Sequence, residues 1–271
     1  MTPKSTTPGF SEEFYPVEEK LEIKEKTQKL KIGIPRECDT NESRVPLTPE
    51  AVDILVRNDH EVIIEQNAGE ASNYSDLQYS EAGAKVVKTR GEVFQSDIVL
   101  KVAPVLNEDI DLVRKNQIIF SAVQIPMQSR QNIEKLMSRK ATAIGFEFLR
   151  DDNDEKPIVE SMSELSGTSS IMIAAEYLSN VHKGKGVLLG GITGVSPTVV
   201  VILGAGTASE YAAKAAMALG AQVQVFDYSL ARLRAIQDRL GQRIFTSVFH
   251  PQILEKSLKT ADVVIGAQDM I

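Results

Sequence analysis

The stretch from Val199 to Asp227 constrains the fold of this chain more than any other part of its sequence. It reads VVVILGAGTASEYAAKAAMALGAQVQVFD. An apolar run ends at Gly204, a helical pattern follows from about Thr207, and a second apolar run ends at Asp227. This order of strand, glycine turn, helix, strand and terminal acid predicts a Rossmann βαβ unit at the start of a doubly wound α/β domain.

The glycines of this unit have separate physical roles. Gly204 permits the tight turn after the strand, and Gly206 lets backbone N–H groups approach a pyrophosphate at the positive end of the helix. Ser209 takes the third position of the pattern, where a small side chain still allows close packing of helix and strand. The predicted phosphate-binding loop also contains Ala205, Thr207 and Ala208.

Asp227 indicates which dinucleotide the unit binds. A carboxylate at the end of the second strand accepts hydrogen bonds from both hydroxyls of the adenosine ribose, whereas a 2′-phosphate would meet like charge there. Arg232 and Arg234 follow Asp227 closely in the sequence. Their positive charges could offset the repulsion of a 2′-phosphate, so they weaken the argument against NADP(H). NAD(H) is the predicted cofactor.

In the rest of the chain, predicted strands and helices alternate as in a two-domain α/β protein. Before residue 160, apolar runs alternate with helical patterns. One helical pattern is 129–140, and another begins with Thr48 as its N-cap and Pro49 at its first position. These predicted strands are 31–35, 61–65, 84–87, 97–102, 117–123 and 142–146. Later strands are predicted at 198–204, 221–227, 243–247 and 261–267. Such alternation predicts two doubly wound, mostly parallel sheets covered on both faces.

The predicted domains are an N-terminal arm at 1–29, a substrate-binding α/β domain at 30–160, a linking helix at 161–182 and a partial Rossmann domain at 183–271. The arm is too polar to bury a core. The apolar pattern at 163–180 predicts a long helix packed between the domains. Because the sequence stops at Ile271 directly after a strand, we expect it to be truncated.

Composition narrows the partners and the compartment. The net charge of -7 and the lack of a basic run with interleaved aromatic residues argue against a nucleic-acid partner. Cys38 is the single cysteine, which excludes an internal disulfide framework or a cysteine-based metal cluster and fits a reducing compartment. Since no leader-like or membrane-spanning apolar segment is present, we expect a cytoplasmic protein without membrane insertion.

Several segments together resemble one family. They are IGIPRE and ESRVPLTPEAV, HEVIIEQNAGEAS, DIVLKV, MSELSG, GKGVLLGGITGVSP and LGAGTASEYAAKAAMALGA, in this order. The chain is similar to the family of alanine dehydrogenases and the NAD domains of proton-translocating transhydrogenases. For the dehydrogenases, the resemblance implies a two-domain homo-oligomer, a hexamer or dimer, that reversibly deaminates L-alanine to pyruvate with NAD. Ser163, in MSELSG, joins the predicted cofactor-binding residues.

Two residues match the substrate site that this resemblance implies. Arg44 matches the arginine that holds the substrate carboxylate, a task suited to a guanidinium fork. Lys101 matches the lysine that contacts the reacting end of a small 2-oxo or 2-amino acid and serves in catalysis. Lys101 also follows a buried strand pattern, where an unpaired ammonium is costly, so it is expected at a strand end facing a cleft.

Gln124 departs from the family's pattern. It stands where alanine dehydrogenases carry a histidine that exchanges protons with the substrate, and it is included as a catalytic candidate. An amide can orient a substrate by hydrogen bonding but cannot titrate. None of the three histidines is an evident substitute, and the family's catalytic aspartate falls beyond Ile271.

Three functions follow from these observations. The first is an NAD-dependent oxidoreductase resembling alanine dehydrogenase. The second is the NAD(H)-binding subunit of a transhydrogenase-type complex, which Gln124 fits, although Arg44 and Lys101 retain the dehydrogenase pair. The third is a nucleotide-binding regulator without catalysis.

Overall fold

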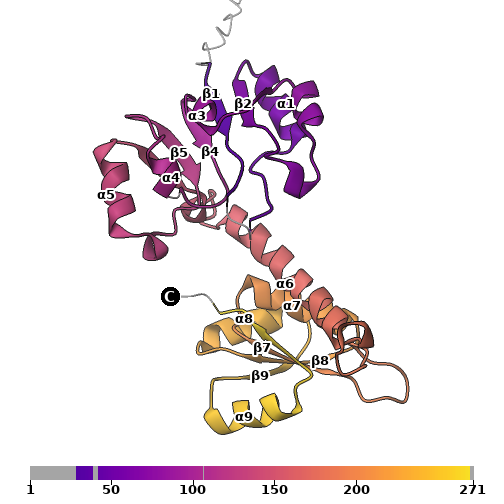
Figure 1. Cartoon of the computed structure of the whole chain (residues 1–271). Coiled ribbons are helices and arrows are strands. Elements are labelled where there is room, and N and C mark those ends of the chain that lie inside the picture. The colour runs from indigo at the N-terminus through magenta and orange to yellow at the C-terminus, as the bar shows by residue number, and fades with distance from the viewer. Residues whose placement is uncertain (1–28, 39–41, 106, 269–271) are drawn as a thin grey trace, which may run out of the picture.

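The computed structural model of the chain describes residues 29–38, 42–105 and 107–268. Nearly all of the predicted arm at 1–29 lies outside these residues. Two α/β lobes follow one another along the chain, and the long helix α6 runs from one to the other (Figure 1). Both lobes contain a parallel sheet, which confirms the predicted fold class.

The first lobe is built on a six-stranded sheet in the order β3-β2-β1-β4-β5-β6, and every neighbouring pair is parallel. Its strands are β1 (Lys31–Ile34), β2 (Glu61–Glu65), β3 (Lys85–Val87), β4 (Ile98–Leu100), β5 (Ile118–Ser121) and β6 (Thr142–Gly145). The strand order reverses direction between β1 and β4. In doubly wound sheets, ligands bind beyond the carboxyl ends of the two strands at this switch point.

Five helices connect these strands in the described part of the chain. They are α1 (Pro49–Arg57), α2 (Asp76–Glu81), α3 (Arg90–Val93), α4 (Asn107–Ile110) and α5 (Arg130–Ser138). The Thr48 hydroxyl accepts a hydrogen bond from the Ala51 N–H and caps α1, as the sequence predicts. Short 3₁₀ turns lie at Glu70–Ser72, Ile125–Met127, Phe146–Phe148 and, after α6, Asn180–His182.

Helix α6 (Pro157–Leu178) joins the lobes, and its predicted start at Ser163 is wrong. The helix begins at Pro157, because proline is well suited to the first helical position, where its missing N–H would be unpaired anyway. Farther along, Gly167 lies against the backbone of Ala208, and a Cβ at this glycine would overlap the Ala208 carbonyl oxygen. The contact holds α6 close to the second lobe.

The second lobe has a four-stranded parallel sheet in the order β10-β7-β8-β9. Its strands are β7 (Val199–Leu203), β8 (Gln222–Phe226), β9 (Phe245–Ser247) and β10 (Val263–Gly266), and its helices are α7 (Thr207–Ala218), α8 (Leu230–Leu240) and α9 (Pro251–Thr260). Val200, Ile202 and Val225 lie in its buried core. This sheet has its own switch point, between β7 and β10.

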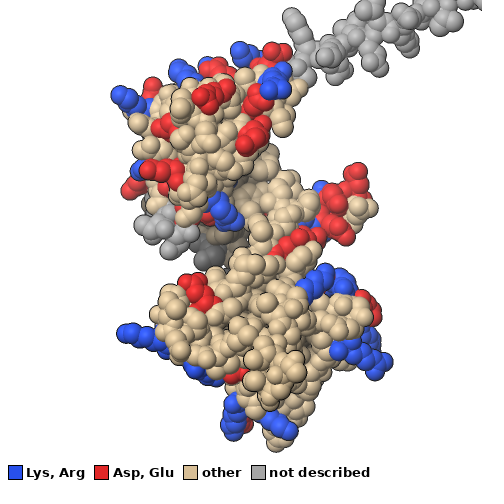
Figure 2. Space-filling model, turned by 90° about the vertical axis from the view of Figure 1, so that its right-hand side faces the viewer, with Lys and Arg blue, Asp and Glu red and all other residues tan. Residues whose placement is uncertain are grey.

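Figure 2 shows that the molecule narrows between the lobes, where uncharged residues form much of the visible surface. None of the helices in the described ranges combines the length and apolar character needed to cross a bilayer.

Candidate active site

The glycine turn of the second lobe lies at its switch point. Gly204 follows β7 with a φ of 116°, and a Cβ there would overlap the carbonyl oxygen of Ala267, which follows β10. Only glycine satisfies both conditions. Gly206 is the N-cap of α7, and no side chain in the described residues caps this helix. The first N–H groups of α7 are therefore open to an anionic group.

A cavity of about 620 Å³ lies at this helix start. Five of the residues predicted to bind the cofactor line it: Ser163, Ala205, Gly206, Thr207 and Ala208. We call this space the glycine-loop cavity. Its charged wall residues are the cations Lys156, Arg232 and Arg239 and the acids Glu155, Glu160, Glu164 and Glu210. Ser209 is fully buried behind the loop, as close packing of helix and strand requires.

Asp227 lies at the end of β8 and is held in place by the backbone. Its Oδ2 accepts a hydrogen bond from the Ala205 N–H at 2.9 Å, and its Oδ1 accepts one from the Ser229 N–H at 2.7 Å. The residue is only 5% exposed. Because each carboxylate oxygen can accept a second hydrogen bond, Asp227 keeps acceptor sites suited to ribose hydroxyls.

Glu210 is a charged residue of this cavity that the sequence reasoning missed. It lies in the first turn of α7 and is 6% exposed. Its carboxylate pairs with Lys214 at 2.6 Å and with Arg239 of α8. The two cations neutralise an acid that would otherwise repel a phosphate. The Lys214 partner, four residues along the helix, was visible in the sequence, whereas the Arg239 pairing depends on the fold.

In the first lobe, Lys101 follows β4 at the switch point. The residue is 2% exposed, and its Nζ lies 2.8 Å from Glu37 Oε2 and 3.5 Å from Asp109 Oδ2. The sequence places Lys101 correctly at a buried strand end but not its two partners. Glu37 follows β1, and Asp109 lies in α4. The ammonium is thus buried with counter-charges from both sides of the switch point.

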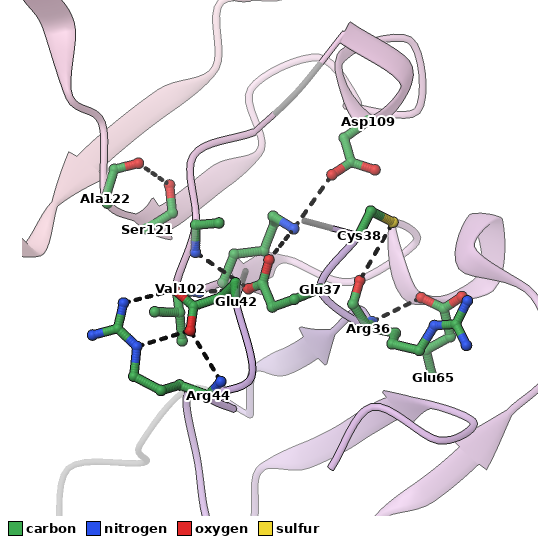
Figure 3. Close-up of polar contacts among 12 residues, drawn as sticks. Arg36, Glu37, Cys38, Glu42, Arg44, Glu65, Val102, Asp109, Ser121 and Ala122 are labelled. Atoms are coloured by element: carbon green, nitrogen blue, oxygen red, sulfur yellow. Dashed lines mark hydrogen bonds and ion pairs between the residues drawn. The ribbon is translucent and has the colours of Figure 1, made fainter. Parts of the chain in front are cut away.

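Glu37 also orders the backbone beyond β4. Its Oε1 accepts hydrogen bonds from the Val102 N–H at 2.7 Å and the Ala103 N–H at 3.4 Å. Figure 3 shows the Glu37 carboxylate directed toward Val102. One carboxylate therefore holds both the Lys101 ammonium and the strand end that carries it.

Arg90 extends this charge network. Its guanidinium pairs with Asp109 and, at 3.1 Å, with Glu65 Oε2. Burial is the largest influence on the Arg90 pKa and lowers it, but the hydrogen bonds and charge of Asp109, aided by Glu65, outweigh burial and raise the pKa. Arg90 remains a cation, which keeps Asp109 paired.

Arg44 is bound by the nearby carboxylate of Glu42. Its Nε and Nη2 donate to Glu42 at 2.8 and 2.6 Å (Figure 3). Its Nη1 lies 3.4 Å from the Met162 sulfur. The hydrogen bond raises the pKa of Arg44 and lowers that of Glu42. About half of the Arg44 side chain is exposed, so the guanidinium is oriented yet open to a ligand.

A second cavity, of about 230 Å³, brings the two predicted substrate residues together. We call it the small cavity. Arg44 and Lys101 line it with nine apolar or aromatic residues: Val45, Pro46, Leu47, Leu100, Val102, Phe120, Phe146, Ile158 and Met162. Two cations in an otherwise apolar wall suit a small carboxylate.

Gln124 lies outside the small cavity. It follows β5, is exposed, and has a φ of 45°. Its backbone N–H and that of Val123 each donate to Glu147 Oε1 at 2.8 Å. The other oxygen, Oε2, is buried and has no hydrogen-bond partner among the described residues. Glu147 thus fixes this turn, a role that nothing in the sequence pattern indicated.

Helix α6 lies between the two cavities. Ile158 and Met162 line the small cavity, whereas Val159 and Ser163 line the glycine-loop cavity. Residues four apart in a helix lie on the same face, so each pair shares one face of α6. The two pairs are offset by one residue and therefore lie on neighbouring faces of the helix. One turn of α6 therefore contributes side chains to both cavities.

The sequence matches both domain models of one family. The model "Alanine dehydrogenase/PNT, N-terminal domain" matches residues 33–166, and the model "Alanine dehydrogenase/PNT, C-terminal domain" matches residues 170–270. Alanine dehydrogenase 2 from Staphylococcus aureus (strain Mu50) is 37% identical over 238 residues, which are 88% of this chain and 64% of that protein. The chain therefore spans less than two thirds of the curated relatives it matches.

Solved structures agree with this assignment. An L-alanine dehydrogenase matches with a TM-score of 0.77 and 36% identity over 87% of this chain and 65% of that one. A transhydrogenase from Sinorhizobium meliloti matches with a TM-score of 0.74 and 23% identity over 89% of this chain and 70% of that one, which establishes a shared fold. From the two domain models and these relatives, we conclude that the chain belongs to the alanine dehydrogenase/PNT family.

Proposed function

We propose that the protein is an NAD-dependent amino-acid dehydrogenase that converts L-alanine, NAD⁺ and water to pyruvate, ammonium, NADH and a proton. The observation that carries this proposal is the placement of Arg44 and Lys101 in one small cavity beside the glycine-loop cavity. Two relatives that are 36–37% identical over most of this chain are named alanine dehydrogenases.

The glycine-loop cavity fits NAD(H). The open N–H groups at the start of α7 suit its pyrophosphate. Asp227 does not line the cavity but is hydrogen-bonded to Ala205, which does, and its remaining acceptor sites suit the hydroxyls of the adenosine ribose. Ser163 lies on the α6 side of the cavity, with its hydroxyl donating to the Val159 carbonyl oxygen at 2.9 Å. When bound, the nicotinamide supplies the acceptor for the hydride that leaves the substrate α-carbon.

Arg44 and Lys101 would then bind the substrate. The guanidinium of Arg44 has N–H donors beyond those given to Glu42, and these can hold the substrate carboxylate. The Lys101 ammonium has three donors, of which Glu37 and Asp109 face two. The third can donate to the carbonyl oxygen of the 2-oxo acid, where the fixed positive charge stabilises developing negative charge.

The sequence predicts that Gln124 orients a substrate through its amide, but the residue is exposed and does not line the small cavity. Its position outside the small cavity gives this role no direct support. Because an amide cannot titrate, the proton transfers of imine formation and hydrolysis need a group other than Gln124.

NADH oxidation with pyruvate and ammonium tests the proposed reaction. We expect turnover that requires all three reactants. An absence of turnover with pyruvate and with every other 2-oxo acid would reject the dehydrogenase proposal.

A second candidate, hydride transfer to another nucleotide on a partner subunit, is favoured by the non-titrating Gln124. It predicts exchange between NADH and an NAD analogue that depends on the second subunit. Such exchange without amino-acid formation would select this candidate over the first.

A further inference from the structure

Asp109 is a buried acid that two cations share unequally. It lies in α4, and its side chain is only 4% exposed. Arg90 holds the carboxylate side-on, because its Nε donates to Oδ1 and its Nη2 donates to Oδ2 at 2.8 Å. Lys101 Nζ lies farther away, 3.5 Å from the same Oδ2. This bidentate contact fixes the Asp109 carboxylate on the Arg90 side.

Arg90 lies outside the small cavity. Its Nη1 donates to the Arg36 carbonyl oxygen at 2.7 Å and to Glu65 Oε2 at 3.1 Å. These contacts tie the guanidinium to the chain beyond β1 and to the end of β2. Because Arg90 does not line the small cavity, it can act on a substrate there only through Asp109 and Lys101.

The Lys101 ammonium has one close acid among the described residues, Glu37, with Oε2 at 2.8 Å. Removing Arg90 would change this. Asp109 would become a buried carboxylate whose remaining cationic partner in the described chain is Lys101. Since an unpaired buried charge is costly, Asp109 would close on Lys101. A substrate oxygen would then compete with two acids for one ammonium.

We propose that Arg90 is a positioning residue of the active site, which holds Asp109 back and so keeps the Lys101 ammonium available to the carbonyl oxygen of pyruvate. This inference rests on the proposed function, because it concerns the same substrate in the same cavity. The two acids beside Lys101 have different roles. Glu37 anchors the ammonium, whereas Asp109 competes with the substrate unless Arg90 restrains it.

Calorimetric titration of the NADH-saturated protein with pyruvate tests this inference in Arg90→Gln, in Asp109→Asn and in the variant that combines them. Arg90→Gln should raise the dissociation constant of pyruvate at least about tenfold, because a charged hydrogen bond to the substrate is lost to a competing acid. In Asp109→Asn the competing charge is absent, while Arg90 keeps Glu65 and Lys101 keeps Glu37. This variant and the combined one should bind pyruvate within about threefold of the unmodified protein, or more tightly.

Two further readouts distinguish positioning from support of the fold. Partial unfolding lowers the fraction of protein that binds pyruvate and leaves the dissociation constant of the folded fraction unchanged. The dissociation constant of NADH should not change in these variants, because Arg90 and Asp109 do not line the glycine-loop cavity. The control is Arg57→Gln, which removes a cation of α1 that is 77% exposed and pairs with Asp53. It should change neither constant.

Unchanged pyruvate affinity in Arg90→Gln would overturn the inference, and so would an equal loss of affinity in Asp109→Asn. If Arg90→Gln does not fold, the combined variant decides. Its pyruvate affinity should stay near that of the unmodified protein, and a loss of about tenfold would contradict the inference. An absence of pyruvate binding by the unmodified protein would overturn it as well.

Turnover with pyruvate, ammonium and NADH, measured in parallel, separates the two proposals. If the unmodified protein reduces pyruvate and Arg90→Gln binds it equally well, the positioning role fails and the dehydrogenase proposal stands. If the variants bind pyruvate in the expected pattern but none of the proteins oxidises NADH, the positioning role stands and the dehydrogenase proposal fails.

Discussion

The buried ammonium of Lys101 is compatible with a stable fold only because Glu37 and Asp109 lie beside it. Removing one partner of a buried ion pair leaves charge without compensation, and this costs much more than losing an exposed pair. The Lys101 pair with Glu37 has side chains only 2% and 5% exposed. Glu37 is therefore the residue of the site whose removal should affect stability most.

We predict that Glu37→Gln lowers the free energy of unfolding by roughly 3 kcal/mol. The matched control is Glu61→Gln, which breaks the pair of Glu61 with Lys31, where the Nζ–Oε2 distance is 3.6 Å and the side chains are 32% and 52% exposed. This control should cost less than about 1 kcal/mol. Urea denaturation at pH 7 measures both, and equal effects would contradict the role assigned to Glu37.

A second prediction concerns pH. The hydrogen bond from Arg44 lowers the pKa of Glu42 below its ordinary value of 4.5. A carboxylate with a lowered pKa in the folded state contributes stability above its unfolded pKa and loses it as pH falls toward the folded value. Glu42→Gln should therefore destabilise the protein at pH 7, with an effect that shrinks below about pH 4.5. Urea denaturation at pH 7 and pH 3 checks this, and a pH-independent effect would oppose it.

The sequence predicts some residues of the site but not the residues that pair with them. Arg44 and Lys101 were found through the family resemblance, and Lys101 also through its position after a buried strand. Glu37, Asp109 and Glu147 were missed because their roles arise from pairing between segments far apart in the chain. The separation of Gln124 from the small cavity likewise depends on how its turn is held by Glu147.

At the level of helices and strands, long periodic segments were predicted well and short ones were not. All ten strands of the described chain lie within or overlap predicted apolar runs. Helices α2, α3 and α4 were missed, since segments of four to six residues carry too little periodicity. The start of α6 was misplaced because Pro157 resembles the end of a loop as much as the first position of a helix.

The close packing of α6 on α7 gives a prediction for Gly167. Gly167→Ala introduces a Cβ that overlaps the Ala208 carbonyl oxygen, so α6 must move away from the start of α7. We expect a loss of about 1–3 kcal/mol in unfolding free energy and weaker NADH binding, because α6 forms one wall of the glycine-loop cavity.

Gly91→Ala is the control for this prediction. Gly91 lies in α3, and a Cβ there meets no described atom within 4 Å. Because alanine favours helices over glycine, this change should leave stability equal or slightly higher. Thermal unfolding and NADH fluorescence titration measure both variants. Wild-type behaviour of Gly167→Ala would show that the α6–α7 contact is not tight.

At the scale of the whole molecule, two doubly wound sheets place their switch points on cavities that share α6. The helix also exposes large apolar side chains: Leu165, Met172, Ile173 and Tyr177 are 54–70% exposed. The predicted homo-oligomer would cover this surface. The predicted domain limits at residues 160 and 183, and the cytoplasmic location, stay predictions.

Light scattering after size-exclusion chromatography tests the oligomer prediction. We expect a mass of two or six chains. The double variant Met172→Glu with Ile173→Glu should reduce this mass. Met137→Glu, on the exposed side of α5, is the control and should not change the mass. A single-chain mass for the unmodified protein would refute the prediction.

The central claim is that NADH and a 2-oxo acid bind in neighbouring cavities and exchange a hydride. The most direct measurement is mass spectrometry of the product formed from a 2-oxo acid, ammonium and NADH that carries deuterium at the transferred C4 position. The account predicts an amino acid with one deuterium at C2. Binding of NADH without any labelled amino acid, or with the label passing only to another nucleotide, would contradict it.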